Sequence, residues 1–207
     1  IIPRENEKFY SEKIIRMPNC FLCNDNKKEI SKESICRRDY NLPDQGFIFT
    51  CFNSNKKISP KEFDIWMRLL LNKKDSILWL LKSNNQAEFN LKREAEKRNV
   101  DPSRLIFAEK INLEKHLARH KYGDLALDTF NVNGHTTSSD ALWSGLPLLT
   151  MIGKSFTARV SASLLNSLGM NELITNTEIE YEDKANELAH NPIKLANIKE
   201  KIKHAKE

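Results

Sequence analysis

Short apolar runs alternate along this chain with longer stretches in which apolar residues recur at helical spacing. We predict six buried strands from the apolar runs, at 47–52, 77–81, 104–107, 125–127, 147–150 and 173–174. We predict five helices between and after the strands, at 60–71, 88–98, 113–120, 136–143 and 155–168. Two charged helices then complete the chain. This alternation predicts an α/β, Rossmann-like three-layer domain, in which helices cover both faces of a mostly parallel sheet.

Capping residues support several of these helix boundaries. Ser59 and Glu62 form the pattern of a capping box, with Pro60 at the first helical position between them. Asn112 is suited to begin the helix at 113–120, and Gly169 is suited to end the helix at 155–168. The helix limits are therefore predicted from local chemistry as well as from periodicity.

The first 44 residues lack such a pattern. They contain scattered charges and three prolines, Pro3, Pro18 and Pro43. We interpret residues 1–44 as a linker or edge segment of a preceding lobe, and residues 45–207 as the Rossmann-like lobe. Because the chain begins at Ile1 instead of methionine, we expect it to be part of a longer or processed protein.

Charge and hydrophobicity narrow the classes of partner. The net charge is +5, but the 33 Lys and Arg residues are dispersed among 28 Asp and Glu residues. The densest basic segments, 92–98 and 194–206, contain interspersed Glu and are typical of solvated helices, so nucleic acid is a lesser alternative and not a predicted partner. No apolar run approaches the roughly 20 residues that span a membrane, so no membrane partner is expected.

Two groups of residues require a check for metal binding. Cys20 and Cys23 have the spacing of half a zinc site, and Cys36 follows, but Cys51 falls within a predicted strand. We interpret the four cysteines as reduced thiols, which suits a cytoplasmic protein. His116 and His120 are four residues apart on one short helix, but no third ligand is evident. We therefore expect no metal.

The fold class itself predicts where a ligand binds. In open parallel sheets, ligands bind beyond the carboxyl ends of the strands, near the point where strand order reverses. That rule selects four loops, at 53–57, 109–113, 129–137 and 151–156. With the usual strand order, the first and fourth strands are neighbours, which brings Lys57 towards the turn at His135, Thr136 and Thr137.

The segment from Asp128 to Gly145 carries the strongest indication of chemistry. A strand, a small-residue turn at Gly134 and a polar helix start direct unpaired backbone N–H groups at one point, which is a natural anion site. The alternative is a well-capped structural helix. We favour phosphate binding because His135, Thr136 and Thr137, together with two serines, exceed what a plain cap uses.

Residues further along the same helices suggest contacts with a nucleoside. Asp140, one turn into the helix, is placed to accept from sugar hydroxyls, although a helix i,i+4 partner is the alternative. His116, with Arg119 one turn on, is suited to stack on a base. The chain contains neither a glycine-rich dinucleotide fingerprint nor a Walker lysine motif. These residues together favour a nucleoside diphosphate with a sugar attached.

The motifs of the chain resemble those of a known family. The residues that carry the resemblance are Phe52-Asn53-x-x-x-Lys57-Ile58-x-Pro60, Ile77–Leu81, Asp128-Thr129, Asn133-Gly134-His135-Thr136-Thr137-x-x-Asp140-x-Leu142-Trp143-x-Gly145-x-Pro147, Ala158-Arg159-Val160-x-Ala162-Ser163 and Glu180–Asp183. They resemble the protein O-linked N-acetylglucosamine transferases, over a match that runs from about Tyr10 to the end. The resemblance implies one lobe of a GT-B glycosyltransferase, namely the C-terminal lobe that binds UDP. It also implies a missing N-terminal catalytic lobe and tetratricopeptide repeats before it.

The resemblance also implies roles for individual residues. Lys57 would be the catalytic residue that stabilises the departing diphosphate. The donor-binding set would comprise Ser54, His116, Arg119, His135, Thr136, Thr137 and Asp140, with the last of these on the ribose. Ser54 stands where the family has a glutamine, Leu113 where it has a lysine, and Val132 where it has a cysteine.

The resemblance implies a function in protein glycosylation. The enzyme would transfer the sugar of a UDP-sugar donor, namely UDP-N-acetylglucosamine, to Ser or Thr hydroxyls of proteins with inversion. The donor is the substrate, and no cofactor is expected. Because the other lobe is absent here, we expect this fragment alone to be inactive. The alternative from a different class is a non-catalytic interaction module that keeps the fold but has lost the donor, which the residues Ser54 and Leu113 motivate.

Overall fold

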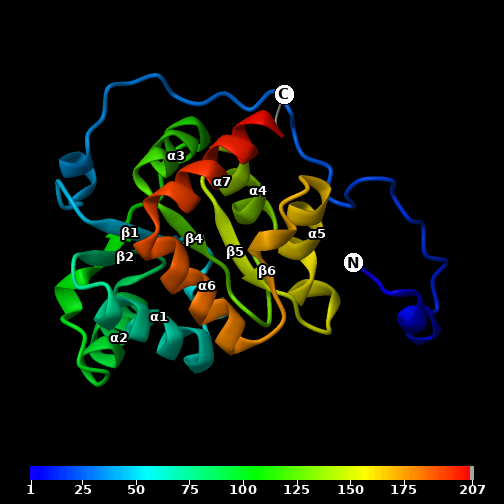
Figure 1. The fold of residues 1–207 in the computed structure, drawn as a ribbon, viewed down its shortest axis with the longest axis horizontal. Helices are drawn as coiled ribbons and strands as arrows, with labels where there is room; N and C mark the ends of the chain where they lie inside the picture. The colour runs from blue at the N-terminus through cyan, green and yellow to red at the C-terminus, as the bar shows by residue number, and fades with distance from the viewer. Residues whose placement is uncertain (206–207) are drawn as a thin grey trace.

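The computed structural model describes residues 1–205 and contains one six-stranded sheet (Figure 1). Its strands are β1 (Phe47–Cys51), β2 (Ser76–Leu81), β3 (Leu105–Ala108), β4 (Leu125–Leu127), β5 (Leu148–Met151) and β6 (Ile174–Thr175). Their order is β3-β2-β1-β4-β5-β6, and each neighbouring pair is parallel. The predicted α/β, Rossmann-like fold is therefore confirmed, and β1 and β4 meet where the strand order reverses.

Helices cover both faces of this sheet (Figure 1). They are α1 (Pro60–Asn72), α2 (Asn85–Glu96), α3 (Leu113–Arg119), α4 (Thr136–Trp143), α5 (Val160–Ser167), α6 (Glu178–His190) and α7 (Pro192–His204). Helix α1 packs beside α6, whereas α4 packs beside α5 and α3. Both α6 and the α4–α5 pair contact β5. The helices on the two faces form the outer two of three layers (Figure 1).

The core holds the strand ends in fixed positions. Trp66 on α1, Trp79 on β2 and Tyr181 on α6 are fully buried. The Tyr181 hydroxyl donates to the backbone oxygen of Asp128 at 3.3 Å, directly after β4. Burying three large aromatic side chains contributes several kcal/mol, at roughly 25 cal/mol per Å² of apolar surface removed from water. Packing thus fixes the point at which the fourth strand ends.

The helix boundaries follow the local chemistry of the sequence with some differences. The capping box of Ser59 and Glu62 is present at the start of α1. Helix α2 begins at Asn85, earlier than predicted, because the Asn84 side chain accepts from the amide of Ala87 and caps it. The helix predicted at 155–168 is split into a 3-10 turn, η6 (Phe156–Ala158), and α5. The predicted last strand begins one residue later than expected, because Leu173 belongs to the 3-10 turn η7 (Asn171–Leu173).

The first 44 residues run as extended coil outside the helices (blue in Figure 1), interrupted by the 3-10 turns η1 (Arg4–Phe9) and η2 (Arg37–Tyr40). The last part of this stretch is packed onto the sheet: Leu42 is 4 % exposed, and the ring of Tyr40 lies 5.4 Å from that of Trp79. The boundary predicted at residue 44 stays a prediction, but residues 40–42 cover one face of β1 and β2.

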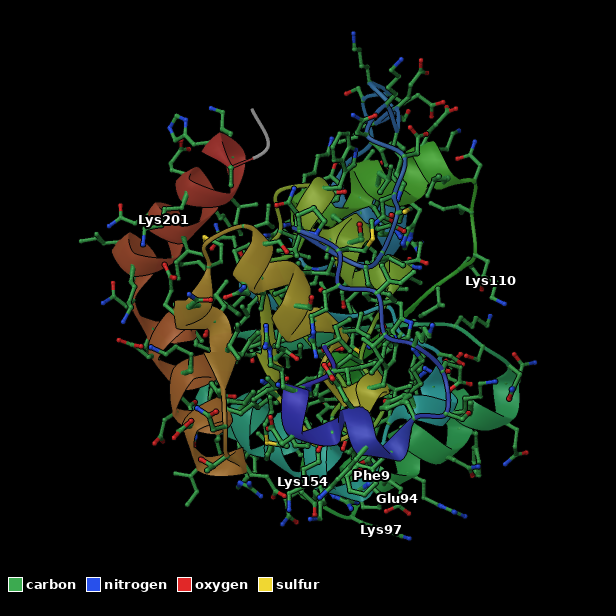
Figure 2. All side chains as sticks on the ribbon, turned by 90° about the vertical axis from the view of Figure 1, so that its right-hand side faces the viewer. Phe9, Glu94, Lys97, Lys110, Lys154 and Lys201 are labelled. Carbon is green, nitrogen blue, oxygen red and sulfur yellow. The ribbon has the colours of Figure 1, made fainter. Side chains whose placement is uncertain are left out.

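Charged side chains project at separate places around the molecule. In Figure 2, Lys201 lies at the left edge, Lys110 at the right edge, and Lys97 and Lys154 near the lower edge. The segment 194–206 was predicted to be solvated, and its residue 206 lies outside the described part of the chain. In this segment Lys194 pairs with Glu187, and Lys201 pairs with Glu172. The basic residues of α7 are therefore interspersed with acidic partners. Within residues 1–205, no helix is long and apolar enough to cross a membrane.

Candidate functional site

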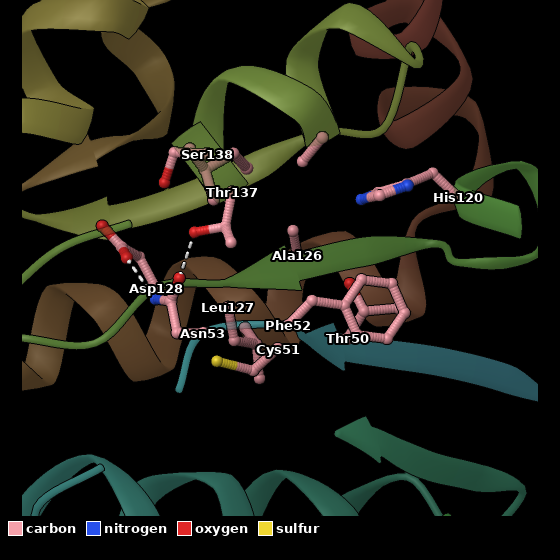
Figure 3. A pocket seen from close by; sticks show the side chains of 12 residues that line it. Thr50, Cys51, Phe52, Asn53, His120, Ala126, Leu127, Asp128, Thr137 and Ser138 are labelled. Carbon is pink, nitrogen blue, oxygen red and sulfur yellow. Dashed lines mark hydrogen bonds between the residues drawn. The ribbon is translucent and has the colours of Figure 1, made fainter. Parts of the chain in front are cut away.

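The carboxyl ends of β1 and β4 lie side by side, because Phe49 pairs with Leu125 and Thr50 with Ala126. The chain leaves β1 into the 3-10 turn η3 (Asn55–Lys57), and it leaves β4 into the turn that begins at Asp128. A pocket lies between these ends and the start of α4 (Figure 3). The residues that line it are Thr50, Cys51, Phe52, Asn53, His120, Ala126, Leu127, Asp128, Thr137, Ser138, Ala141 and Leu148.

Asp128 organises the turn after β4. Its Oδ1 atom accepts from the backbone amides of Thr129 at 2.9 Å and Gly134 at 2.7 Å, and from the side chain of Asn53 at 3.1 Å. Its Oδ2 atom accepts from the Thr150 hydroxyl at 2.8 Å. Burial raises the pKa of Asp128 above its usual value, and these donors oppose that shift. The carboxyl group therefore ties β1, β4, β5 and the start of α4 to one another.

Gly134 is required by close packing at the start of α4. A Cβ atom at this position would lie 2.2 Å from the Ser138 hydroxyl oxygen, 2.7 Å from that of Thr137 and 2.8 Å from the Asn53 side-chain oxygen. The first intrahelical bond of α4 runs from the Ser139 amide to the His135 oxygen at 3.0 Å. The amides before Ser139 point towards the pocket end of the helix, where the helix dipole is positive.

Lys57 reaches this turn from the other strand. Its Nζ atom donates to the backbone oxygen of Asn133 at 2.8 Å. Burial lowers the pKa of Lys57, and the charge of Asp128 opposes that shift. The structure thus brings Lys57 and the turn before α4 together, as the sequence predicted. A cation and the positive end of a helix face one point, and this arrangement favours an anion.

The predicted phosphate-binding residues differ in how they are held. Thr136 is exposed, whereas the Thr137 hydroxyl donates to the Asn53 side-chain oxygen. The His135 ring is half-buried, and its Nε2 atom is enclosed with no partner in the described part of the chain. Burial lowers the pKa of His135, and the charge of Lys57 lowers it further. Ser138, predicted as a further hydroxyl donor, instead bonds Ser161 on α5 at 2.8 Å and holds the two helices together.

A second group of residues lies on α3, beside Phe52. The His116 ring is 5.3 Å from the Phe52 ring, and Nη2 of Arg119 lies 2.5 Å from His116 Nδ1. Burial, with the nearby His120 and Arg119, lowers the pKa of His116 to about 3. The imidazole is therefore neutral at physiological pH. Because the guanidinium has no acceptor atom, His116 Nδ1 must accept, and its Nε2 atom must carry the proton.

Arg119 is enclosed and does not face solvent. It is 1 % exposed, its guanidinium lies 4.7 Å from the centre of the Phe52 ring, and it donates to the Glu109 backbone oxygen at 2.7 Å. Burial lowers its pKa to about 10, so it stays a cation at neutral pH. In this structure Arg119 fixes His116 and the loop after β3. Its direct contact with a base stays a prediction.

Asp140 lies on the buried side of α4, one turn from its start. It is 4 % exposed, and its Oδ1 atom is 2.7 Å from Nζ of Lys28. The alternative was that Asp140 pairs with a residue four positions away on its own helix. The structure shows a different partner, because Lys28 belongs to the first 44 residues. Of the remaining positions, Ser54 precedes η3 and is half-buried, and Leu113 is 49 % exposed at the start of α3.

The cysteines and histidines do not assemble into a cluster in the described residues. Cys20, Cys23, Cys36 and Cys51 are free thiols, and no group of three or more metal-ligating side chains within residues 1–205 could hold a metal ion. The His120 Nδ1–H group donates to the His116 backbone oxygen at 2.8 Å, and burial lowers the pKa of His120 to about 4. His116 and His120 are thus held by α3 and Phe52.

Three residues that shape the site, Asp128, Asn53 and Lys28, were not predicted from the sequence. Asp128 and Asn53 belong to the motifs of the resemblance but have no predicted role. Their position directly after, or within two residues of, a buried strand could have indicated a role in the site. Lys28 gave no signal, because it is one of several lysines in an irregular segment and its partner lies 112 positions away.

The chain belongs to glycosyl transferase family 41, whose model matches residues 24–207. It is 34 % identical, over 98 % of this chain and 21 % of the relative, to a probable UDP-N-acetylglucosamine–peptide N-acetylglucosaminyltransferase (SEC) of Arabidopsis thaliana. It is 40 % identical to a UDP-N-acetylglucosamine–peptide N-acetylglucosaminyltransferase of Caenorhabditis elegans, over 80 % of this chain and 14 % of the relative. The chain therefore spans about a fifth or less of the length of these relatives.

A solved structure shows the same fold. A mutant of the O-GlcNAc transferase of Thermobaculum terrenum matches 99 % of this chain and 38 % of its own, with a TM-score of 0.87 and 29 % identity. The predicted resemblance to O-linked N-acetylglucosamine transferases and the predicted GT-B lobe are thereby confirmed. The family match begins at residue 24, so it includes part of the segment predicted as a linker.

Proposed function

We propose that this lobe binds the diphosphate and nucleoside of UDP-N-acetylglucosamine, and that the whole protein transfers the sugar to Ser or Thr hydroxyls with inversion. One observation carries the proposal. Lys57 and the turn before α4 meet at the carboxyl ends of adjacent strands, and Lys57 lies 2.8 Å from the Asn133 backbone oxygen. The unpartnered Nε2 atom of His135 in the same turn supports a ligand there.

The proposed chemistry is stabilisation of a leaving group. The bond between the anomeric carbon and the diphosphate oxygen breaks, and a bond to the acceptor hydroxyl oxygen forms. Negative charge grows on the diphosphate as that bond breaks. Lys57 and the amides of α4 stabilise this charge more in the transition state than in the ground state, and so they accelerate transfer. In this proposal the cation and the helix amides supply the positive charge at the leaving group, and no cofactor is needed.

The nucleoside end of the proposed site is formed by α3 and α4. The neutral His116 ring offers a flat surface and an Nε2 proton to a base, while Arg119 holds its orientation. Asp140 accepts from the ribose hydroxyls. Thr136, Thr137 and His135 contact the phosphates, and Ser54 borders the sugar side.

The rest of the proposed protein supplies what this lobe lacks. The relatives' names give a peptide as acceptor, and their greater length is consistent with a preceding catalytic lobe and tetratricopeptide repeats. That lobe would provide the group that takes the proton from the acceptor hydroxyl. A cytoplasmic location, expected from the free thiols, belongs to this proposal as well.

A transfer assay on the full-length protein tests the proposed function. The protein is incubated with labelled UDP-N-acetylglucosamine or UDP-glucose and with peptides that contain Ser or Thr. We expect label on the hydroxyl and release of UDP from the first donor. A folded full-length protein that neither transfers the sugar nor binds UDP at millimolar concentration would overturn the proposal and favour a non-catalytic interaction module.

A further inference from the structure

A short stretch of the first 44 residues crosses from α4 to α3. We call residues 27–35 the strap. The Trp143 indole donates to the Lys28 backbone oxygen at 3.2 Å, and the Ser31 amide donates to the Glu114 backbone oxygen at 3.2 Å. These contacts place the strap at the nucleoside end of the proposed donor site, along the same edge of the molecule as α3 and α4 (Figure 1).

The strap delivers one charged side chain into the interior. The side chains of Lys28 and Asp140 are 9 % and 5 % exposed, and their charged atoms are 2.7 Å apart. Lysine is almost never buried to this extent without a partner, and a buried pair is costly to split. The neighbouring Lys27, by contrast, is exposed. The strap therefore places Lys28 at Asp140 specifically.

The position of this pair has a consequence for donor binding. Asp140 is a carboxylate one turn into the helix proposed to bind phosphates, where its charge would repel a diphosphate. Lys28 compensates that charge locally. The ammonium engages Oδ1 of Asp140, and the second oxygen of the carboxylate is left for a hydroxyl donor.

We propose, building on the proposed function, that Lys28 is a positioning residue of the donor site. It holds the Asp140 carboxylate by one oxygen, so that the other oxygen accepts a hydrogen bond from a ribose hydroxyl of the nucleoside diphosphate. The strap is then part of the nucleoside site, although it precedes the first strand of the lobe. The competing idea is that the pair blocks the ribose and must open before the donor binds.

Titration of the full-length protein with UDP and with 2′,3′-dideoxy-UDP separates these ideas. The variants are Lys28→Met, the conservative Lys28→Arg, and Lys27→Met as a control that removes the same charge one residue away. We expect Lys28→Met to weaken UDP binding by about tenfold or more, the size of a hydrogen bond to a charged group. Its effect on dideoxy-UDP should be smaller, because that ligand lacks the hydroxyls and is weakened only by the uncompensated charge of Asp140.

The other variants make the test specific. Lys28→Arg should recover most of the lost affinity for UDP, and Lys27→Met should leave it within about twofold, as expected for an exposed charge. Thermal unfolding of each variant identifies loss of fold. The inference is wrong if Lys28→Met binds UDP as tightly as the wild type or more tightly, or if it weakens both ligands equally. A wild-type protein that binds no UDP would instead overturn the proposed function.

Discussion

The diphosphate end of the proposed site and its nucleoside end are held together by contacts of different range. At the diphosphate end, Asp128 binds the amide of Gly134, six residues further along the chain, at 2.7 Å. At the nucleoside end, Asp140 binds Lys28 at 2.7 Å across 112 positions of sequence. The turn at the diphosphate end is thus shaped mainly within one strand–turn–helix unit, which Asn53 and Lys57 join from the loop after the neighbouring strand β1. The nucleoside end, by contrast, depends on a segment outside the sheet.

The two ends also differ in electrostatics. The diphosphate end presents Lys57 and the positive end of α4 to one point, so it attracts negative charge. The nucleoside end presents a neutral imidazole at His116 and a charge-compensated pair at Asp140, so it suits an uncharged base and ribose. This difference predicts that substitutions at the first end alter the rate of transfer and those at the second end alter donor affinity.

The largest effect is expected for Lys57→Ala in the full-length protein. Lys57 neutralises charge that develops on the leaving group, so kcat should fall by about 10²–10³-fold with little change in donor KM. Steady-state kinetics at varied donor concentration measures this. Lys56→Ala is the matched control, because Lys56 is exposed in the same turn and should have little effect. An intact kcat with a raised KM would contradict the role assigned to Lys57.

A smaller effect, of the opposite kinetic type, is expected for Asp140→Ala. Its ribose contact is made equally in the ground and transition states, so donor KM should rise by about 1.5–3 kcal/mol in free-energy terms while kcat stays close to normal. The same kinetic assay measures donor KM and kcat. Because the substitution leaves Lys28 unpaired, the unfolding temperature of the variant shows whether the fold is destabilised. If Asp140→Ala mainly lowers kcat, the proposed difference between the two ends, rate of transfer at one and donor affinity at the other, is contradicted.

Gly134→Ala tests the geometry of the turn. The added Cβ would lie within 2.8 Å of three side-chain oxygens, so the start of α4 must shift. We expect about 1–3 kcal/mol of lost stability, as for overpacking, together with weaker UDP binding. Gly145→Ala is the control: its φ of +82° makes alanine strained, but no atom lies within 4 Å of the new Cβ. It should lower stability and spare UDP affinity.

The last effect concerns the pH dependence of stability and not the donor site. His116 and His120 have native pKa values of about 3 and about 4, below the value near 6.5 of an unfolded chain. The unfolded state therefore binds more protons as pH falls below 6.5, and stability should be lost by about 1.4 kcal/mol per pH unit for each histidine. Urea unfolding at pH 7, 6 and 5 measures the slope. His116→Gln should reduce it, and His190→Gln, on the exposed surface of α6, should not.

The same difference in range explains what the sequence could predict. The strands, the capping box at Ser59 and the polar turn at Gly134 are set by neighbours in sequence, and the structure confirms them. The split before α5 was missed because the chain breaks at Arg159, whose φ is −125° and whose side chain donates to the Gly153 oxygen. The role of the strap was not predicted, because tertiary packing determines the partner of Lys28 and local sequence patterns carry no information about it.

Calorimetric titration of the full-length wild type and its Lys57→Ala variant, with UDP and with uridine, tests most directly whether Lys57 and the start of α4 bind the diphosphate. UDP carries the charge that develops on the leaving group, whereas uridine lacks the phosphates. We predict that Lys57→Ala weakens UDP binding by about tenfold or more, as for a hydrogen bond to a charged group, and leaves uridine binding unchanged. Equal losses for both ligands, or unchanged UDP binding, would contradict the assignment of the diphosphate to Lys57 and the start of α4.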